Sequence, residues 1–190
     1  MNRSPVLPWI LLLLWAAWAQ AAQGLLAGSA AWIPDLGVVL LLSLAARLPH
    51  EALPGVALAV ALGRIAVSVE PPTAVLAGML ALVAVTRGLR TVLEVDGLLA
   101  RSLLAGLGAW VFALWLGEVH EARVLAESTF HAGSLPRVWA EQQPLVGAAG
   151  WRGPLATAGV ALVFGPAVAR LPGLGPLHRR KTWARGASDR

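Results

Sequence analysis

Long apolar segments alternate with short polar joints along the whole chain. A helix needs about 20 mostly apolar residues to cross the hydrocarbon core of a bilayer, and shorter spans require tilting, bilayer thinning or burial among neighbours. The pattern predicts an all-α integral membrane protein, a compact bundle of about six transmembrane helices. The expected spans are Val6–Ala22, Pro34–Leu48, Leu53–Val69, Thr73–Thr86, Leu98–Gly117 and Gly153–Leu171.

One domain is expected to contain all six spans. We expect residues 1–172 to form this transmembrane domain, with an outer polar segment at 118–150, and residues 173–190 to form a basic cytoplasmic tail. The tight joint Arg47–Glu51 makes the second and third spans an antiparallel hairpin. The prolines of "VEPP" (Val69–Pro72) mark the next turn, because proline cannot continue the third helix.

Composition supports a membrane protein over a soluble one. Hydrophobic residues make up 57% of the 190 residues and charged residues 13%, against about 25% charged in a typical soluble domain. The net charge of +5 therefore indicates basic cytoplasmic loops, and nucleic acid is not an expected partner. The absence of cysteine excludes disulfides and thiolate metal ligands.

The distribution of basic residues predicts the orientation. With both termini in the cytoplasm, eleven of the fifteen Lys and Arg residues lie on the inner side, as the positive-inside rule requires. An alternative is that the first span is a cleaved signal peptide, since Arg3, the apolar run Val6–Ala19 and "AQA" (Ala19–Ala21) have that pattern. Five spans would then remain.

Small residues recur at a spacing of four in three of the predicted spans. Lipid provides no hydrophobic drive between helices, so small residues that permit close approach mark contact faces. We expect these faces to hold the bundle together, with docking of a partner as the alternative. The predicted packing residues are Gly55, Ala59 and Gly63, then Ala109, Ala113 and Gly117, then Ala161 and Gly165.

Arg64 is the one charge placed clearly inside a predicted span. A charge at that depth should face the bundle and find a partner, or extend outward to the membrane surface. The expected topology places Asp35, Glu70 and Glu118 near the same level, and we predict an ion pair with one of them, with Asp35 and Glu118 ranked above Glu70. Glu70 follows at i+6, which is the wrong face of a continuous helix. Asp35 is also expected to cap the second span, where the helix dipole favours an acid.

No catalytic, metal or cofactor site is predicted. "DGLLAR" (Asp96–Arg101) resembles the first half of the signature of CDP-alcohol phosphotransferases, a remote alternative function. That signature continues with Gly at 110 and Asp at 114 and 118, where this chain has Trp110, Leu114 and Glu118. Leucine is no ligand for a divalent cation that prefers oxygen. "HEALP" and "HEARV" both lack the second histidine of a zinc helix.

The C-terminal segment "HRRKTWAR" is a compact basic cluster. It is expected to contact anionic lipid, with docking of an acidic partner as the alternative. Its basic residues are Arg179, Arg180, Lys181 and Arg185.

Three stretches resemble the family of the rod-shape-determining protein MreD. The stretch "WIPDLGVVLLLSLAARLPHEALPGVALAVALG" (Trp32–Gly63) is similar to the Pro-Asp-Leu opening of that family's second span and the Gly-containing third span. "PPTAVLAGMLALV" (Pro71–Val83) resembles its proline-rich turn and fourth span, and Trp151–Leu171 resembles its last span before a basic tail. The family commonly has an acid late in span three, near the position of Arg64 in this chain.

The resemblance implies a non-enzymatic scaffold of the cell-elongation machinery in the bacterial inner membrane. Its implied partners are the bilayer, an MreC-like single-span protein, an actin-like filament protein and peptidoglycan synthases. The implied fold is similar to the substrate-binding subunits of energy-coupling-factor transporters, so a vitamin-type transporter subunit is the alternative function. No small-molecule ligand is expected, because such a pocket needs convergent polar groups and the spans contain few.

Overall fold

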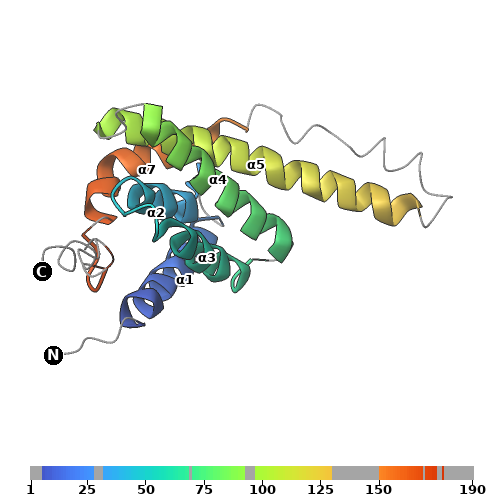
Figure 1. The fold of residues 1–190 in the computed structure, drawn as a ribbon. Coiled ribbons are helices and arrows are strands. Elements are labelled where there is room, and N and C mark those ends of the chain that lie inside the picture. The colour runs from blue at the N-terminus through green and yellow to red at the C-terminus, as the bar shows by residue number, and fades with distance from the viewer. Residues whose placement is uncertain are drawn as a thin grey trace, which may run out of the picture.

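The computed structural model describes residues 6–27, 32–68, 70–92, 97–129, 150–168, 170–174 and 177, and these are all helical or connecting segments. No strand occurs among them, which confirms the predicted all-α class. The helices, shown in Figure 1, are α1 (Leu7–Ala27), α2 (Leu36–Ala45), α3 (Leu53–Ile65), α4 (Pro72–Val92), α5 (Leu98–Thr129) and α7 (Arg152–Val168).

Three of the helices are long and apolar enough to cross a membrane. They contain the stretches Leu7–Leu26, Pro72–Arg90 and Leu98–Arg123, of 20, 19 and 26 residues. The other three, α2, α3 and α7, are apolar but have only 10, 13 and 17 residues. Three of the six expected spans therefore have the length needed to cross a membrane. The other three are apolar but shorter.

The short helix α2 is the centre of the bundle. Every residue from Gly37 to Ala45 is buried, and α2 packs against α1, α3, α4, α5 and α7 (Figure 1). Its ten residues rise only about 15 Å, at 1.5 Å per residue. A helix this short does not need to match the bilayer, because the surrounding helices cover its surface.

Close backbone approach joins α3 to α1. Gly55 faces the indole of Trp9, and Gly63 lies directly against the backbone of Ala16 and Ala17. The predicted small-residue face of α3 is therefore an internal packing face. Ala59, between the two glycines, is also buried.

The other two predicted packing faces divide between buried and exposed positions. Ala109 and Ala161 are buried, and Gly165 lies against the hydroxyl of Ser43. Ala113 is exposed and Gly117 has open space around it, so the described residues do not show the packing that was predicted at these two positions. The reason is the length of α5, which carries both residues beyond the part that packs on α7.

Helix α5 is longer than the sequence pattern predicted. The fifth span was expected to end at Gly117, with a solvated loop and an interfacial helix in residues 118–150, but α5 itself continues to Thr129. Its 32 residues rise about 48 Å, and Figure 1 shows its C-terminal part extending beyond the other helices. Residues 130–149, and the basic cluster at 178–185, lie outside the described part.

The α1–α3 contact predicts a sharp difference between two glycine-to-alanine substitutions. In Gly63→Ala the new Cβ would lie 2.9 Å from backbone atoms of Ala16 and Ala17, which cannot move away as a flexible side chain could. We expect the free energy of unfolding in detergent to fall by about 1–3 kcal/mol, as for an overpacked core.

Gly159→Ala is the matched control. Gly159 is exposed inside α7 and has no atom within 4 Å of a new Cβ. We expect this variant to be stabilised by about 0.5–1 kcal/mol, because alanine loses less backbone entropy in a helix. Equal effects of the two substitutions would contradict the close packing of α3 on α1.

Candidate functional site

A cluster of three charged side chains lies at the end of the bundle where α2 begins, here called the Asp35 end. The guanidinium of Arg64 donates to Asp35 Oδ2 at 2.5 Å, and to Glu70 Oε2 and Oε1 at 2.5 and 2.7 Å. Arg64 is only 6% exposed. The predicted pair of Arg64 with Asp35 is therefore present, and the alternative of an arginine extended into solvent is wrong.

Asp35 is held in place because it caps α2. Its backbone is extended (φ −81°, ψ 93°), and its Oδ1 accepts the N–H of Val38 at 2.9 Å, as expected for an N-cap residue. Its own N–H donates to the hydroxyl of Thr157 on α7 at 2.8 Å, and that hydroxyl donates to Gly153 O. One aspartate thus connects the start of α2 to α7 and, through Arg64, to α3.

Glu70 reaches Arg64 because α3 is shorter than predicted. The expected span ran to Val69, which would put Glu70 on another face of the same helix. Instead, α3 ends at Ile65, and the N–H of Ser68 bonds back to the carbonyl of Arg64. The chain then turns and places the Glu70 carboxylate on the guanidinium in a two-point contact.

Glu118 is not part of the cluster. It lies on α5, it is exposed, and the described residues contain no ion pair between it and Arg64. The prediction of Glu118 as an alternative partner is therefore wrong. Phe112 of α5 lies at the level of Arg64, and Glu118 comes six residues further along the same helix.

The ring of Phe112 closes the remaining side of the arginine. The guanidinium carbon of Arg64 lies 4.8 Å from the ring centroid, a cation–π geometry, and Phe112 is almost fully buried. The exposed fractions of the Asp35 and Glu70 side chains are 16% and 28%. Of the two carboxylates, that of Glu70 therefore has more access to solvent than that of Asp35.

Helix α1 adds two glutamines that the hydropathy pattern did not predict. Gln23 Oε1 accepts the N–H of Leu36 at 3.1 Å, so it satisfies a backbone donor at the start of α2. Gln20 is buried against Gly37. The sequence indicates this polar contact with α2 only by placing Gln20 and Gln23 about one turn apart on an otherwise apolar helix.

The cluster has no group free for catalysis in the described part of the chain. Arg64 is saturated by two carboxylates and a ring, and no group of three His, Asp or Glu side chains there is placed to hold a metal ion. Asp96, the first residue of the half-signature "DGLLAR", lies outside the described residues. The arrangement is one that fixes helices relative to one another.

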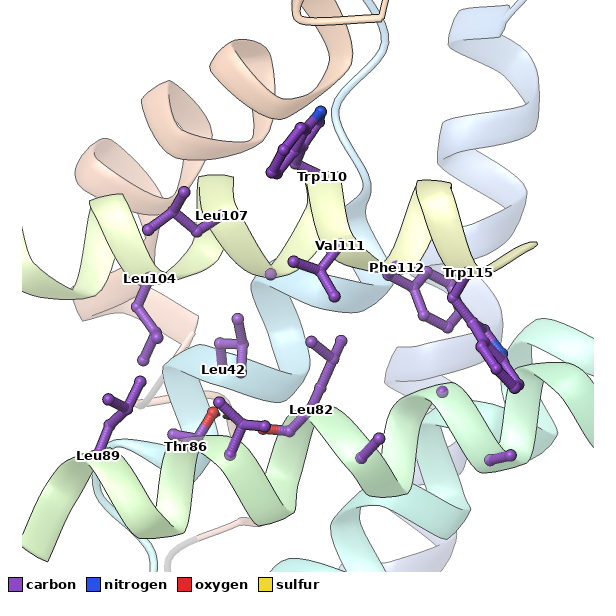
Figure 2. A pocket seen from close by; sticks show the side chains of 15 residues that line it. Leu42, Leu82, Thr86, Leu89, Leu104, Leu107, Trp110, Val111, Phe112 and Trp115 are labelled. Carbon is purple, nitrogen blue, oxygen red and sulfur yellow. Dashed lines mark hydrogen bonds between the residues drawn. The ribbon is translucent and has the colours of Figure 1, made fainter. Parts of the chain in front are cut away.

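An apolar groove runs between α4 and α5, beginning next to the cluster (Figure 2). It has a volume of about 550 Å³, and Phe112 belongs both to its wall and to the cation–π contact with Arg64. Leu42 of α2 lies in its wall. Among the described residues that line it, the Thr86 hydroxyl is the only polar side-chain group besides two indoles, and it donates to Leu82 O at 2.7 Å.

At the Asp35 end the two groove helices are joined directly. Gly78 of α4 faces Phe112 and Trp115, and the indole N–H of Trp115 donates to Ala74 O at 2.9 Å.

A smaller apolar groove of about 330 Å³ lies between α1 and α3, beside Trp9 and Gly55. Both grooves present hydrocarbon rather than hydrogen-bonding groups.

Comparison with protein-family models, with curated proteins and with solved structures found no match. Function must therefore be inferred from the chemistry of the ion cluster, the grooves and the exposed helix surfaces.

The cluster predicts a large cost for removing the arginine alone. In Arg64→Met two carboxylates lose their common counter-charge, and breaking a buried ion pair on one side typically costs about 3–5 kcal/mol. Arg64→Lys should be intermediate, because a lysine cannot form the two-point contact with Glu70. The measurement is unfolding in mixed detergent micelles.

Arg87→Met, on the exposed surface of α4, is the control for loss of one positive charge. Its expected effect is within about 0.5 kcal/mol. If Arg64→Met were no more destabilising than Arg87→Met, the cluster would not be a structural centre.

The hydroxyl of Thr157 gives a second prediction. Thr157→Val conserves shape but leaves the part-buried N–H of Asp35 without its acceptor, at a cost of about 1–3 kcal/mol. Thr157→Ser keeps the hydroxyl and loses one methyl group, worth about 0.8 kcal/mol. The same unfolding assay should rank valine as more destabilising than serine, and the reverse order would contradict the capping role.

Proposed function

We propose that this chain is a non-enzymatic membrane scaffold of the MreD type, which joins an MreC-like single-span protein to the cell-elongation machinery. In this proposal the protein crosses the bacterial inner membrane several times with both termini in the cytoplasm. Actin-like filaments would be linked on the cytoplasmic side and peptidoglycan synthases on the other. The resemblance of Trp32–Gly63 and Trp151–Leu171 to that family supports the proposal.

The state of the polar groups in the bundle favours a scaffold over a transporter subunit. The buried arginine is neutralised internally, and the larger groove contains a single hydroxyl that already donates to a backbone carbonyl. A pocket for a polar vitamin needs several convergent polar groups, which neither groove offers. Apolar outer surfaces instead suit lateral packing in a membrane.

The observation that carries the proposal is the length and character of α5. Its 32 residues rise about 48 Å, whereas the hydrocarbon core is about 30 Å thick, so roughly the last third of the helix lies beyond it. Glu118, His120, Glu121 and Arg123 are exposed on this extension. A helix that projects from the bundle and carries both signs of charge suits contact with the extracytoplasmic part of a partner.

Two small residues of α5 with space around them fit the same interpretation. Ala113 and Gly117 lie four residues apart at the base of the extension, where nothing in the described part of the chain packs closely on Gly117. Small residues at this spacing allow a second helix to approach closely within a membrane. The partner's single span would meet α5 here, and its outer domain would meet the extension.

Site-specific photocrosslinking tests the proposal. A photoreactive residue at His120, on the extension, should crosslink an MreC-like protein in cells of the source species, while one at exposed Arg87 on α4 should not. Crosslinking from both positions or from neither would contradict docking on α5.

Co-purification of the unmodified chain separates the two parts of the proposal. If an MreC-like partner co-purifies but does not crosslink at His120, the partner binds a surface other than the α5 extension. Persistent absence of any such partner would reject the scaffold function itself.

A further inference from the structure

Helix α3 is short, although one side of it is open to the surroundings. Exposed residues at a spacing of four form a single line along the helix and its C-cap, called here the α3 stripe. They are Pro54, Leu58, Leu62 and Ala66. Leu58 and Leu62 are 46% and 47% exposed. The α3 stripe is therefore a lateral surface of the molecule, unlike α2, which the surrounding helices cover.

Irregular, exposed segments bound α3 at both ends. Residues 46–52, before the helix, form turns in which His50 and Glu51 are exposed. After the helix, Val67 is exposed and the chain turns towards Glu70 and the ion cluster. In a membrane, lipid-exposed irregular backbone does not lie within the hydrocarbon region, because its N–H and C=O groups would lack partners there. The hydrocarbon layer beside the α3 stripe is therefore limited to the helix itself.

The helix is too short for a typical bilayer. The 13 residues Leu53–Ile65 rise about 20 Å, whereas the hydrocarbon core is about 30 Å thick. Tilting cannot remove the difference, since a tilted helix spans less of the layer. A mismatch of about 10 Å remains on this side of the bundle.

The packing of α1 on α3 places an indole at the level where α3 ends. Gly55 faces the indole of Trp9. Gly63, two turns later, lies against Ala16, so the two helices run in the same direction. Trp18 comes two residues after Ala16 and is 64% exposed, which puts its indole near the last turn of α3. Because tryptophan favours the interface between hydrocarbon and headgroups, this indole supports a membrane boundary at the end of α3.

The opposite side of the bundle is thicker. Helix α2 lies between α3 and the pair α5 and α7 (Figure 1). The 17 residues of α7 rise about 25 Å. In α5 the stretch from Ser102 to Gly117 has no charged residue and also rises about 24 Å. The apolar surface is thus about 5 Å shorter at the α3 stripe than across the bundle.

We propose that the protein thins the bilayer to about 20 Å beside the α3 stripe, so that this surface contacts a compressed layer of lipid acyl chains. Glu51 and the turn after Ile65 then meet headgroups and water, and the last turns of α1, from Gln20 to Ala27, lie among the headgroups. Compressing lipid has only a modest cost per Å, whereas placing a charge and unpaired backbone groups in hydrocarbon costs more. The inference rests on the chain crossing a membrane and does not depend on the scaffold function.

The lipid dependence of stability is the first test. The full-length protein is reconstituted in phosphatidylcholines that differ only in chain length, namely dimyristoleoyl, dioleoyl and dierucoyl. Its melting temperature should be highest in the short lipid and fall towards the long one, because each added carbon increases the mismatch at α3. No dependence on chain length, or the reverse order, would overturn the inference.

A matched pair of variants locates the effect. His50→Leu combined with Glu51→Leu lengthens the apolar surface at α3 by about 3 Å, so the melting temperatures in the short and intermediate lipids should move closer together. The exposed pair His120 and Glu121 on α5 allows the same double change as a control. Glu118 still separates that pair from the apolar part of α5, so the control should leave the difference unchanged. Equal shifts in the two variants would overturn the location at α3.

Spin labels test what covers the α3 stripe. The chain has no cysteine, so Leu58→Cys and Val67→Cys each place one nitroxide. In dioleoyl bilayers the label at Leu58 should be relaxed by oxygen, which dissolves in hydrocarbon, and the label at Val67 by a water-soluble nickel complex. Dipolar broadening at Leu58 would show that a second copy covers the stripe and would overturn the inference. A label at Val67 that is shielded from nickel would also overturn it.

Discussion

A positive charge buried among apolar side chains must be neutralised, and this constraint organises the Asp35 end of the molecule. Desolvating an ion costs several kcal/mol, and Arg64 recovers that cost only where two carboxylates and an aromatic ring converge on it. The carboxylates come from the cap of α2 and from the turn before α4, and the ring comes from α5. Through the N–H of Asp35 the same constraint extends to Thr157 on α7. The ion cluster therefore fixes helices that are far apart in the sequence, around the short, fully buried α2.

Internal neutralisation also limits which groups of the molecule are accessible to other molecules. An arginine saturated by its own protein is not available to a substrate, and the larger groove, which shares Phe112 with it, is lined by hydrocarbon. What the molecule presents to its surroundings is an apolar lateral surface and a projecting polar helix at one end. These features fit a protein that works by contact with lipids and other proteins.

Hydropathy alone predicted the helical class, the six helices of the described residues and most of their starting points, because each apolar run must form internal backbone hydrogen bonds. The pair of Arg64 with Asp35 followed from the cost of a lone buried charge. Glu70 was ranked last among the three candidate partners because the pattern does not show that α3 ends at Ile65. An interfacial helix was expected in residues 118–150, but its continuity with α5 was missed, because hydropathy marks where a span leaves the membrane and not where a helix ends; Glu, Ala, Arg and Leu there all favour helix. Which small residues make contacts was predicted only in part, since that depends on helix lengths and crossing points.

If the ion cluster is structural and function resides on the outer surfaces, the cluster can be replaced without loss of function. The most direct test replaces all three groups at once, as Arg64→Met, Asp35→Asn and Glu70→Gln together, so that no unpaired charge remains while the Asp35 cap keeps an oxygen. Replacing all partners of a buried ion cluster is often nearly neutral for stability, unlike removing one. We predict that this variant folds and still captures an MreC-like partner from membranes at the level of the unmodified chain. A well-folded variant that no longer captures the partner would contradict this prediction, because the charges themselves would then be the functional groups.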